Sequence, residues 1–335
     1  MRAIYYDRTG DAGDVLQEGD LPTPEPGPGE VRVRVVASGV NPSDTKSRGG
    51  WGGGERSGAR VIPHNDGAGE VDAVGEGVDR GRVGQRVWVY EATREGRDRG
   101  TCAPWCVVPE RLAVPLPGGV GFGVGAALGV PAMTAHRALF ANGSVRGRTV
   151  LVTGGGGGVG QMAVQLAAWG GARVLATVHG EEQAADALAH GADATADYTQ
   201  GGVAAWVKEQ TDGGGVDRIV DVNFGANLPV TLEVLKPYGT VATYASGQDP
   251  DTEVPVPFYR LLMKGLQVQT VFVYLMSREA HEHARRDVTA ALGAGALTAR
   301  IGATYPFSAQ GVARAHDDLD ARRFHGKAVV EVAEA

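Results

Sequence analysis

Residues 149–160 read Thr-Val-Leu-Val-Thr-Gly-Gly-Gly-Gly-Gly-Val-Gly, a short β-rich run that leads directly into five consecutive glycines. A second β-rich run follows at residues 173–178. Strand, glycine turn, helix and strand in this order are typical of a doubly wound parallel α/β sheet. The helix between the two runs is predicted because apolar side chains recur there with helical spacing, at Val159, Met162, Ala163, Leu166 and Trp169.

A glycine turn between a strand and a helix is suited to holding a pyrophosphate. Glycines let the backbone come close to phosphates, and the helix N-terminus offers free N–H groups and the positive end of the helix dipole. A flexible glycine loop is the alternative, but it does not explain the flanking periodicity. A Walker A loop is excluded because no Lys-Ser or Lys-Thr pair follows the last glycine. The stretch therefore predicts a dinucleotide site.

The choice of dinucleotide is predicted from the end of the second strand. An NAD site usually places Asp or Glu there, on the ribose 2′-hydroxyl. Residues 177–180 read Thr-Val-His-Gly, and the acids Glu181 and Glu182 come later, at a helix start where acids are favoured anyway. The missing acid favours NADP(H). Only Thr177 and His179 are present to meet a 2′-phosphate, with no Arg or Lys, so NAD(H) stays open.

The glycine turn lies in a longer region of alternating strand and helix patterns, which runs from about residue 123 to 265. Strand patterns occur at residues 216–222 and 240–244, and helical patterns at 181–190 and 228–235. This alternation is typical of a parallel doubly wound sheet.

The flanking regions differ from this core. Apolar and charged residues alternate at 31–35, 70–74 and 86–90, between turns rich in Gly and Pro, so residues 1–122 predict a small β-rich, barrel-like domain. Residues 266–335 mix a β-rich run at 268–274, a helix at 279–292 and a final strand at 328–332. This last region is too small and mixed to form a domain alone, so we expect it to complete another.

Composition restricts the class of protein. A length of 335 residues corresponds to about two domains, and 43% apolar with 21% charged residues excludes a disordered chain. The net charge of −7 speaks against a nucleic-acid partner. No secretory signal precedes the first strand pattern, and the uncharged stretch 112–135 contains three prolines and six glycines, which argues against a membrane span. We expect a soluble, cytoplasmic protein.

The sequence gives little support for a metal site or for a catalytic nucleophile. Cys102 and Cys106 form a C-x3-C pair without a second pair, too little for a structural zinc site and consistent with a reducing compartment. His64, Asn65 and Asp66 look like ligands, but His beside Asp is more often a structural hydrogen-bonding group. No closed ligand set is found, and the G-x-S-x-G motif of serine hydrolases is absent from the sequence.

Several short motifs spread along the chain carry a family resemblance. Together they resemble the zinc-free medium-chain dehydrogenases/reductases of the zeta-crystallin-like quinone oxidoreductase family. The matching segments are Gly39–Asp44, Asp66–Val71, Val74–Gly75, Ala126–Pro131, Thr134–Ala135, Arg137–Leu139, Gly157–Gly160 and Gly326–Lys327.

The resemblance implies a GroES-like, β-rich catalytic domain, residues 1–122 with 266–335, and an inserted Rossmann domain, residues 123–265. It implies an NADPH-dependent reductase that transfers a hydride to a quinone. The alternatives are an NADPH-dependent enoyl or alkenal double-bond reductase of a biosynthetic pathway and a non-catalytic dinucleotide-binding protein. The expected partners are a small-molecule quinone or enone and a second copy of the chain, because the run 268–274 would form an exposed sheet edge.

The resemblance also implies the site residues. Asn41 and Lys46 would act on the acceptor, Asn41 by binding the acceptor or the nicotinamide ribose and Lys46 by stabilising a developing oxyanion, unless Lys46 is a solvated surface lysine. Lys46 and Ala132 replace aromatic residues of the family and would line the substrate pocket. No zinc is expected, because the zinc branch needs a Cys near residues 41–44. The predicted cofactor residues are Asn41, Thr134, Gly156, Gly157, Gly158, Val159, Thr177, His179, Tyr198, Val222, Asn223, Tyr244, Ser246 and Lys327.

Overall fold

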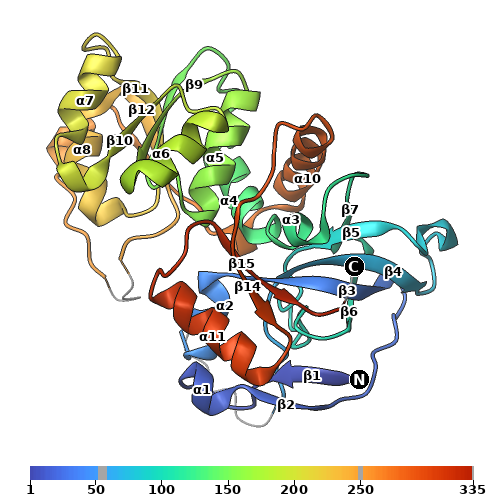
Figure 1. Ribbon diagram of the computed structural model, residues 1–335. Coiled ribbons are helices and arrows are strands. Elements are labelled where there is room, and N and C mark those ends of the chain that lie inside the picture. Colours follow the sequence, from blue (N-terminus) through green and yellow to red (C-terminus); the bar gives the residue numbers. More distant parts are fainter. Residues whose placement is uncertain (52–58, 248–251, 334–335) are drawn as a thin grey trace. The chain divides into compact units, whose positions relative to one another are not determined.

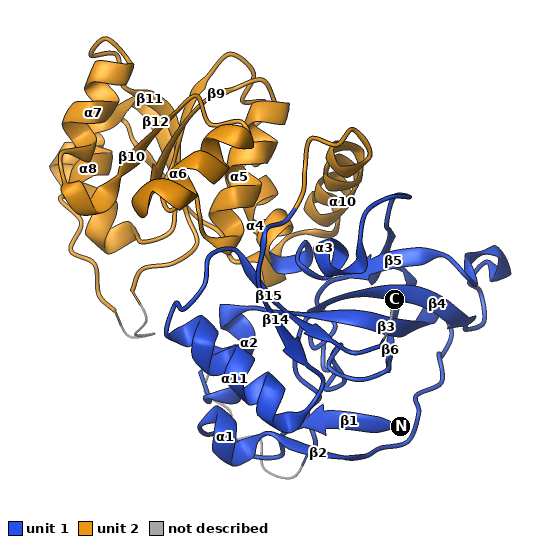
Figure 2. Cartoon of the chain, viewed as in Figure 1, with its two compact units in different colours: residues 1–130, 299–335 blue, residues 131–298 orange. Residues whose placement is uncertain are grey.

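The computed structural model describes residues 1–51, 59–247 and 252–333 (Figure 1). The chain forms two compact units, Met1–Val130 with Ala299–Ala335 and Pro131–Thr298, which Figure 2 shows in blue and orange. Among the described residues, no helix combines the length and the apolar character needed to cross a bilayer.

The unit formed by Pro131–Thr298 is built on a six-stranded sheet in which every neighbouring pair is parallel. Val150, Leu151 and Ile219 in its central strands are fully buried, as expected for a parallel sheet covered by helices. The predicted doubly wound sheet is confirmed. In spatial order the strands are β10 (Ala194–Asp197), β9 (Arg173–Val178), β8 (Thr149–Val152), β11 (Val216–Asp221), β12 (Leu235–Thr243) and β13 (Gln267–Thr270).

Helices connect these strands. Apolar side chains of α7 (Val203–Gln210) and α8 (Phe224–Val234), together with Leu151, Leu175 and Ile219, form a core against the sheet. The helical segments are α4 (Gly129–Phe140), α5 (Gly158–Trp169), α6 (Gly180–Ala189), η3 (Tyr198–Gln200), α7 (Val203–Gln210), α8 (Phe224–Val234), α9 (Phe258–Leu262), η4 (Val273–Leu275) and α10 (Arg278–Gly293).

The other unit is β-rich, as the alternating patterns predict. Its larger sheet runs β14-β15-β3-β4-β5-β7, with β6 paired to β3, and a separate two-stranded sheet joins β1 to β2. The strands are β1 (Arg2–Tyr5), β2 (Gln17–Asp20), β3 (Glu30–Val40), β4 (Asp66–Val74), β5 (Arg86–Val89), β6 (Trp105–Pro109), β7 (Ala113–Pro115), β14 (Ile301–Pro306) and β15 (Lys327–Glu331).

The C-terminal segment completes this unit, because β15 pairs antiparallel with β3. A core that includes Ile4, Ile62, Val312 and Val330 joins residues far apart in the sequence. The helical segments here are α1 (Ala12–Val15), α2 (Pro42–Arg48), η1 (Arg80–Arg82), η2 (Glu110–Leu112), α3 (Phe122–Ala126) and α11 (Ala309–Asp320).

The unit boundaries differ from the predicted domain boundaries. The predicted division fell at residues 122 and 265, whereas the compact units divide after Val130 and after Thr298. Residues 123–130 stay with the β-rich unit because α3 packs on β3 and β4. Residues 266–298 stay with the parallel sheet because β13 pairs with β12 and Thr298 bonds to Gln165 of α5.

Within the parallel sheet, the inner strand β8 marks the place where a ligand is expected. The neighbours of β8 are β9 on one side and β11 on the other, so the chain order reverses there. Ligands of open α/β sheets bind outside the carboxyl ends of the strands at such a reversal. The glycine turn directly follows the carboxyl end of β8.

Candidate functional site

The glycine turn after β8 is packed so closely that side chains are excluded from it. Gly154 has φ +68°, a conformation that favours glycine. A Cβ atom on Gly160 would lie 2.0 Å from the carbonyl oxygen of Gly154. Gly157 is the N-cap residue of α5 and has no side chain to accept from the first helical turn. The N–H groups of Gly158 and Val159, at the start of α5, therefore receive no side-chain cap from the N-cap residue, and a helix N-terminus of this kind favours an anion. Their role as cofactor residues stays a prediction.

Thr177, near the end of β9, holds this turn in place. Its Oγ1 accepts a hydrogen bond from the N–H of Gly154 at 3.1 Å, and its carbonyl oxygen accepts one from Gly155 at 2.7 Å. Because the Thr177 side chain is buried against the turn, its direct role is to shape the glycine loop.

The structure brings together His179 and Tyr198, which follow the neighbouring strands β9 and β10. Their ring centres lie 6.0 Å apart, and 48% of Tyr198 is exposed. Asp197 accepts a hydrogen bond from the N–H of Gly180 at 3.0 Å. Gln183 accepts one from the N–H of His179 at 3.0 Å, and its side chain lies where a Cβ on the predicted residue Gly156 would be. The sequence interpretation missed both Asp197 and Gln183.

Asn223 and Ser246 also lie at the carboxyl edge of the parallel sheet, after β11 and β12. Asn223 accepts a hydrogen bond from the N–H of Gly247 at 3.2 Å, and Ser246 accepts one from that of Gly225 at 3.0 Å. Both line a groove of about 550 Å³ whose other walls are mostly apolar. The apolar walls include Ala226, Leu228, Pro229, Leu232, Val254, Pro255 and Pro257.

The remaining predicted cofactor residues of this unit are less prominent. Val222 is 38% exposed, and its side chain lies 3.1 Å from where a Cβ on Gly154 would be, so it borders the glycine turn. Tyr244 is half-buried just beyond β12. Thr134 is buried within α4.

In the β-rich unit, Asn41 lies at the centre of a buried polar group. Lys327 donates from Nζ to the carbonyl oxygen of Val40 at 2.7 Å and to Oδ1 of Asn41 at 2.5 Å. Asn41 donates from Nδ2 to Asp66 at 2.8 Å, and the N–H of Val130 donates to the same carboxylate. An ammonium only donates, so it fixes which end of the Asn41 carboxamide faces it. Lys327, predicted as a cofactor residue, is thus buried against Asn41, which is itself 1% exposed.

Burial shifts the titration of this group. Desolvation raises the pKa of Asp66 to about 7, although Lys327 and the Asn41 amide oppose the shift. Burial lowers the pKa of Lys327, opposed by the charges of Asp66 and Asp44. The attraction between Lys327 and the two carboxylates offsets part of the desolvation of each.

His64 belongs to a separate series of buried hydrogen bonds. Arg48 donates from Nε to Nδ1 of His316 at 3.2 Å, so His316 carries its proton on Nε2 and donates it to Nε2 of His64 at 2.9 Å. His64 then donates from Nδ1 to Ser38 at 2.8 Å. Burial lowers the pKa of His64 to about 4 and that of His316 as well, so both rings are neutral at pH 7. His64 adopts φ +77°, an unusual conformation for a residue with a side chain.

The three residues that looked like metal ligands point to different partners. His64 bonds to Ser38 and His316, Asn65 donates to Asp44 at 2.8 Å, and Asp66 accepts from Asn41. Within residues 1–51, 59–247 and 252–333, no group of three His, Cys, Asp or Glu could hold a metal ion. The zinc-free expectation stays a prediction. Cys102 and Cys106 are buried thiols whose pKa values are raised by burial.

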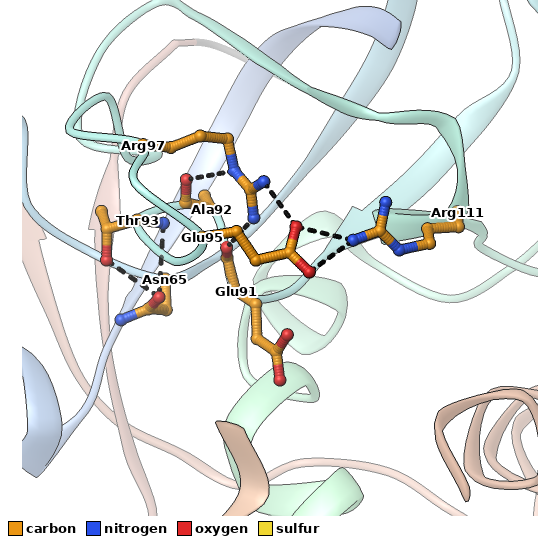
Figure 3. A network of polar contacts seen from close by, with 7 residues as sticks. All are labelled: Asn65, Glu91, Ala92, Thr93, Glu95, Arg97 and Arg111. Carbon is orange, nitrogen blue, oxygen red and sulfur yellow. Dashed lines mark hydrogen bonds and ion pairs between the residues drawn. The ribbon is translucent and has the colours of Figure 1, made fainter. Parts of the chain in front are cut away.

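Asn65 also anchors the loop that follows β5 (Figure 3). Its Oδ1 accepts a hydrogen bond from the hydroxyl of Thr93 at 2.9 Å. Glu95 receives ion pairs from Arg97 at 2.9 Å and from Arg111 at 2.6 Å. In Figure 3 the carboxyl group of the buried Glu91 points away from both guanidinium groups. The loop is therefore tied to the start of β4, next to Asp66, and Arg97 completes the anchor by donating to the carbonyl oxygens of Glu91 and Ala92.

Lys46 and Ala132, the two predicted departures from the family, differ in exposure. The Nζ of Lys46 lies 5.2 Å from the ring centre of Trp51, and Lys46 is half-buried. Ala132 is fully buried, so it presents no surface and the expectation that it lines the substrate pocket is wrong.

Comparison with known proteins agrees with a β-rich unit and a parallel-sheet unit in one chain. Residues 27–118 match the family model of the alcohol dehydrogenase GroES-like domain, and residues 158–290 match that of zinc-binding dehydrogenases. A quinone oxidoreductase of Pseudomonas aeruginosa is 33% identical over 95% of this chain and 95% of its own length.

Solved structures are also similar over almost the whole chain. An NAD-dependent alcohol dehydrogenase has a TM-score of 0.85 at 30% identity and covers 99% of this chain and 100% of its own. A mycobacterial protein complexed with NADPH has a TM-score of 0.83 at 31% identity and covers 99% of each chain. With the GroES-like unit, the Rossmann unit and full-length relatives in place, the chain belongs to the quinone oxidoreductase family of the medium-chain dehydrogenases/reductases.

Proposed function

We propose that this protein is an NADPH-dependent reductase that transfers a hydride to a quinone. The observation that carries the proposal is the glycine turn, where Gly154 and Gly160 leave no room for side chains and α5 begins without a side-chain cap. A pyrophosphate fits there because only the backbone approaches it and the helix N-terminus favours its charge. The mycobacterial relative complexed with NADPH supports the choice of dinucleotide.

The residues that would hold NADPH divide into two groups. The turn and α5 would bind the pyrophosphate through Gly156, Gly157, Gly158 and Val159. The ends of β9 and β10 would bind the adenosine end through His179 and Tyr198, whose rings already face each other. Val222, Asn223, Tyr244 and Ser246 would border the nicotinamide end, and Thr134 would hold its carboxamide. When bound, NADPH supplies a hydride, and the net reaction converts quinone, NADPH and a proton into hydroquinone and NADP⁺.

On the acceptor side, the chain supplies hydrogen bonding and positive charge. Asn41 would bind the acceptor, with its carboxamide held by Lys327 and Asp66, so those two residues position it. Lys46 would stabilise the negative charge that develops on the acceptor oxygen. A quinone or an α,β-unsaturated carbonyl is already activated toward hydride, so a second candidate is the reduction of an enone double bond. The name of the Pseudomonas relative favours the quinone.

A panel of acceptors tests the proposal. Purified protein is mixed with NADPH and either 1,4-benzoquinone, 1,4-naphthoquinone, cyclohex-2-enone or an alkenal, and loss of reduced nicotinamide is followed. Turnover with quinones above the enones is expected. Turnover with enones alone would assign a double-bond reductase, and binding of NADPH without any turnover would assign a non-catalytic dinucleotide-binding protein.

A further inference from the structure

Two polar contacts join α2 to α11, a helix of the C-terminal segment that lies beside it (Figure 1). Arg48 donates from Nε to Nδ1 of His316 at 3.2 Å, across 268 positions of the sequence. The hydroxyl of Thr45 donates to the carboxylate of Asp320 at 2.8 Å. Arg48 also donates to the carbonyl oxygen of Gly10, which lies just before α1. The C-terminal half of α2 is therefore attached to two other segments of the β-rich unit.

Burial makes the contact of Arg48 with α11 specific. Thr45, Arg48 and His316 are all buried, so water does not readily replace a lost partner. A guanidinium taken out of water is costly unless hydrogen bonds compensate for its lost hydration. Nη2 of Arg48 lies 3.9 Å from the carboxylate of Asp320, which is too far for a hydrogen bond. The imidazole of His316 is therefore the side chain of α11 that fixes the direction of Arg48.

His316 is itself held by a series of hydrogen bonds that returns to the start of α2. It donates to His64 at 2.9 Å, and His64 donates to Ser38 at 2.8 Å. Ser38 lies in β3, three residues before Asn41, the N-cap residue of α2. This series and the backbone from Ser38 to Arg48 form a closed ring, and Asn41 lies on the backbone part of it. The position of Asn41 is therefore coupled to the contact at the far end of the helix.

The helix α2 is short enough to turn as one piece. Its seven residues span about 10 Å, so a tilt of about 10° around one end moves the other end by about 2 Å. Lys327 holds Asn41 at one end. Thr45 and Arg48 hold the other end. A misplacement of about 1 Å in a group that acts on a substrate can lower a rate about a hundredfold. A reaction that uses Asn41 or Lys46 therefore requires a fixed direction of α2.

We propose that His316 and Asp320 are positioning residues for hydride transfer, which hold α2 in the direction that the acceptor requires. His316 acts through Arg48, and Asp320 acts through Thr45, so neither has to contact the acceptor or the cofactor. The inference rests on the proposed reductase function and adds to it two residues of the C-terminal segment. It gives α11 a part in turnover besides its part in the core of this unit.

Two variants of His316 separate positioning from stability. Leucine at this position makes neither hydrogen bond. Glutamine can accept from Arg48 at Oε1 and donate from Nε2 to His64, which are the two roles of the imidazole. With saturating NADPH and 1,4-benzoquinone as the acceptor, His316→Leu should lower kcat about tenfold, and His316→Gln should restore most of it. The Kd of NADPH should stay at the wild-type value in both, because the glycine turn is unchanged. A wild-type kcat in His316→Leu, or an equal loss in both variants, would overturn the proposal.

A change at the surface of α11 gives a second test that leaves the buried imidazole in place. The side chain of Asp320 is 51% exposed, so Asp320→Ala should keep the melting temperature of the wild type. Asp317→Ala is the matched control, since Asp317 is an exposed acid of the same helix. Asp320→Ala should lower kcat about threefold, in the range expected for one hydrogen bond, and Asp317→Ala should leave it unchanged. Equal kcat values in these two variants would contradict the role of Asp320, and would overturn the proposal where His316→Leu does not fold.

Crystal structures of the wild type and of His316→Leu supply a readout besides activity. In the variant α2 should move by about 1 Å or more relative to β3 and β15. An unmoved α2 would overturn the proposal. If the wild type reduces no acceptor, the proposed function is wrong, and the place of α2 still decides whether His316 holds the helix. If the wild type reduces benzoquinone while His316→Leu and Asp320→Ala keep full kcat, the function stands and the positioning role is wrong.

Discussion

Among single residues, His64 shows most clearly how context decides a role. The sequence placed it beside Asn65 and Asp66 and suggested either a ligand or a structural hydrogen-bonding group. The structure supports the second reading, because His64 is bonded on both ring nitrogens, to Ser38 and to His316. No local sequence pattern predicts that His316 is the partner of His64, because the two lie more than 250 positions apart and meet only in the folded protein.

The buried His64 ring is predicted to contribute stability that is lost in acid. Its pKa is about 4 in the folded protein, against an ordinary value of 6.5 when unfolded. Between these values the unfolded chain binds the proton and the folded chain does not. Stability contributed by neutral His64 is therefore full above pH 6.5 and is lost as the pH falls toward 4, by up to about 3 kcal/mol.

Urea denaturation at pH 7.5 and pH 5, in the wild type and in a variant without the His64 ring, measures this loss. Asp66 acts in the opposite direction, because its raised pKa makes the fold lose stability as the pH rises from 3.8 to about 7. The His64→Gly variant separates the two, since glycine accepts the positive φ and removes the titrating ring. The loss between pH 7.5 and pH 5 should be smaller in the variant. An unchanged loss would show that His64 does not titrate as described.

Asp197 predicts how the dinucleotide is selected. NADPH should bind more tightly than NADH, because residues 177–180 carry no carboxylate for a ribose hydroxyl. The carboxylate of Asp197, which accepts a hydrogen bond from the N–H of Gly180, would repel a 2′-phosphate bound after β9. Asp197→Asn should strengthen NADPH binding several-fold and leave NADH nearly unchanged, since one charge pair near water is worth about 1 kcal/mol. Fluorescence titration with both cofactors measures the two affinities. Tighter binding of NADH by the wild type would refute the NADPH preference and would point to Glu181, Glu182 or Asp197 as the acid on the ribose hydroxyl.

Among elements, the strands and helices with strong periodicity were predictable. The helix predicted from Val159 to Trp169 is α5, and the run 173–178 is β9. The prediction for α8 began at Leu228, whereas the helix starts at Phe224 and includes Pro229. A proline lowers local helix propensity, but burial of Phe224 and Leu228 against the sheet outweighs it. The β-rich run 268–274 forms only the short strand β13, followed by η4.

The glycine turn makes its own prediction. Gly160→Ala would place a Cβ 2.0 Å from a backbone carbonyl that cannot move freely, so the variant should lose about 1–3 kcal/mol of stability and most of its NADPH affinity. Gly123→Ala is the control, because a Cβ there meets nothing within 4 Å and the residue lies in a helix. Chemical denaturation and NADPH titration of both variants check this, and equal behaviour of the two would contradict the account of the turn.

At the scale of the whole molecule, the length predicted about two domains, the family resemblance implied that one is inserted in the other, and the fold class is confirmed. The compact units divide at other residues than the predicted domains, because short strands reveal their partners only in three dimensions. Residues 267–270 read as part of a mixed tail, yet they extend the parallel sheet by pairing with β12. The family resemblance supplied Asn41, and the sequence alone gave no sign that Lys327 would be buried beside it.

The edge of that sheet predicts a homodimer. β13 is an edge strand, and β-strand edges with apolar neighbours invite pairing with a second copy. Met263 and Leu275 nearby are 83% and 81% exposed. Light scattering at micromolar concentration should give twice the chain mass, and Met263→Glu with Leu275→Glu should give the monomer without loss of helix content. A monomeric wild type would rule out this prediction.

Hydride transfer to a quinone is the reaction that we propose for this chain, and NADPH deuterated at C4 of the nicotinamide reports on it. With 1,4-naphthoquinone at a concentration well below KM, one hydroquinone should form for each NADPH oxidised, and the deuterated cofactor should slow kcat/KM by a primary isotope effect when hydride transfer limits that rate. Oxidation of NADPH without an equal yield of hydroquinone, or no oxidation with any quinone while NADPH is bound, would contradict the account.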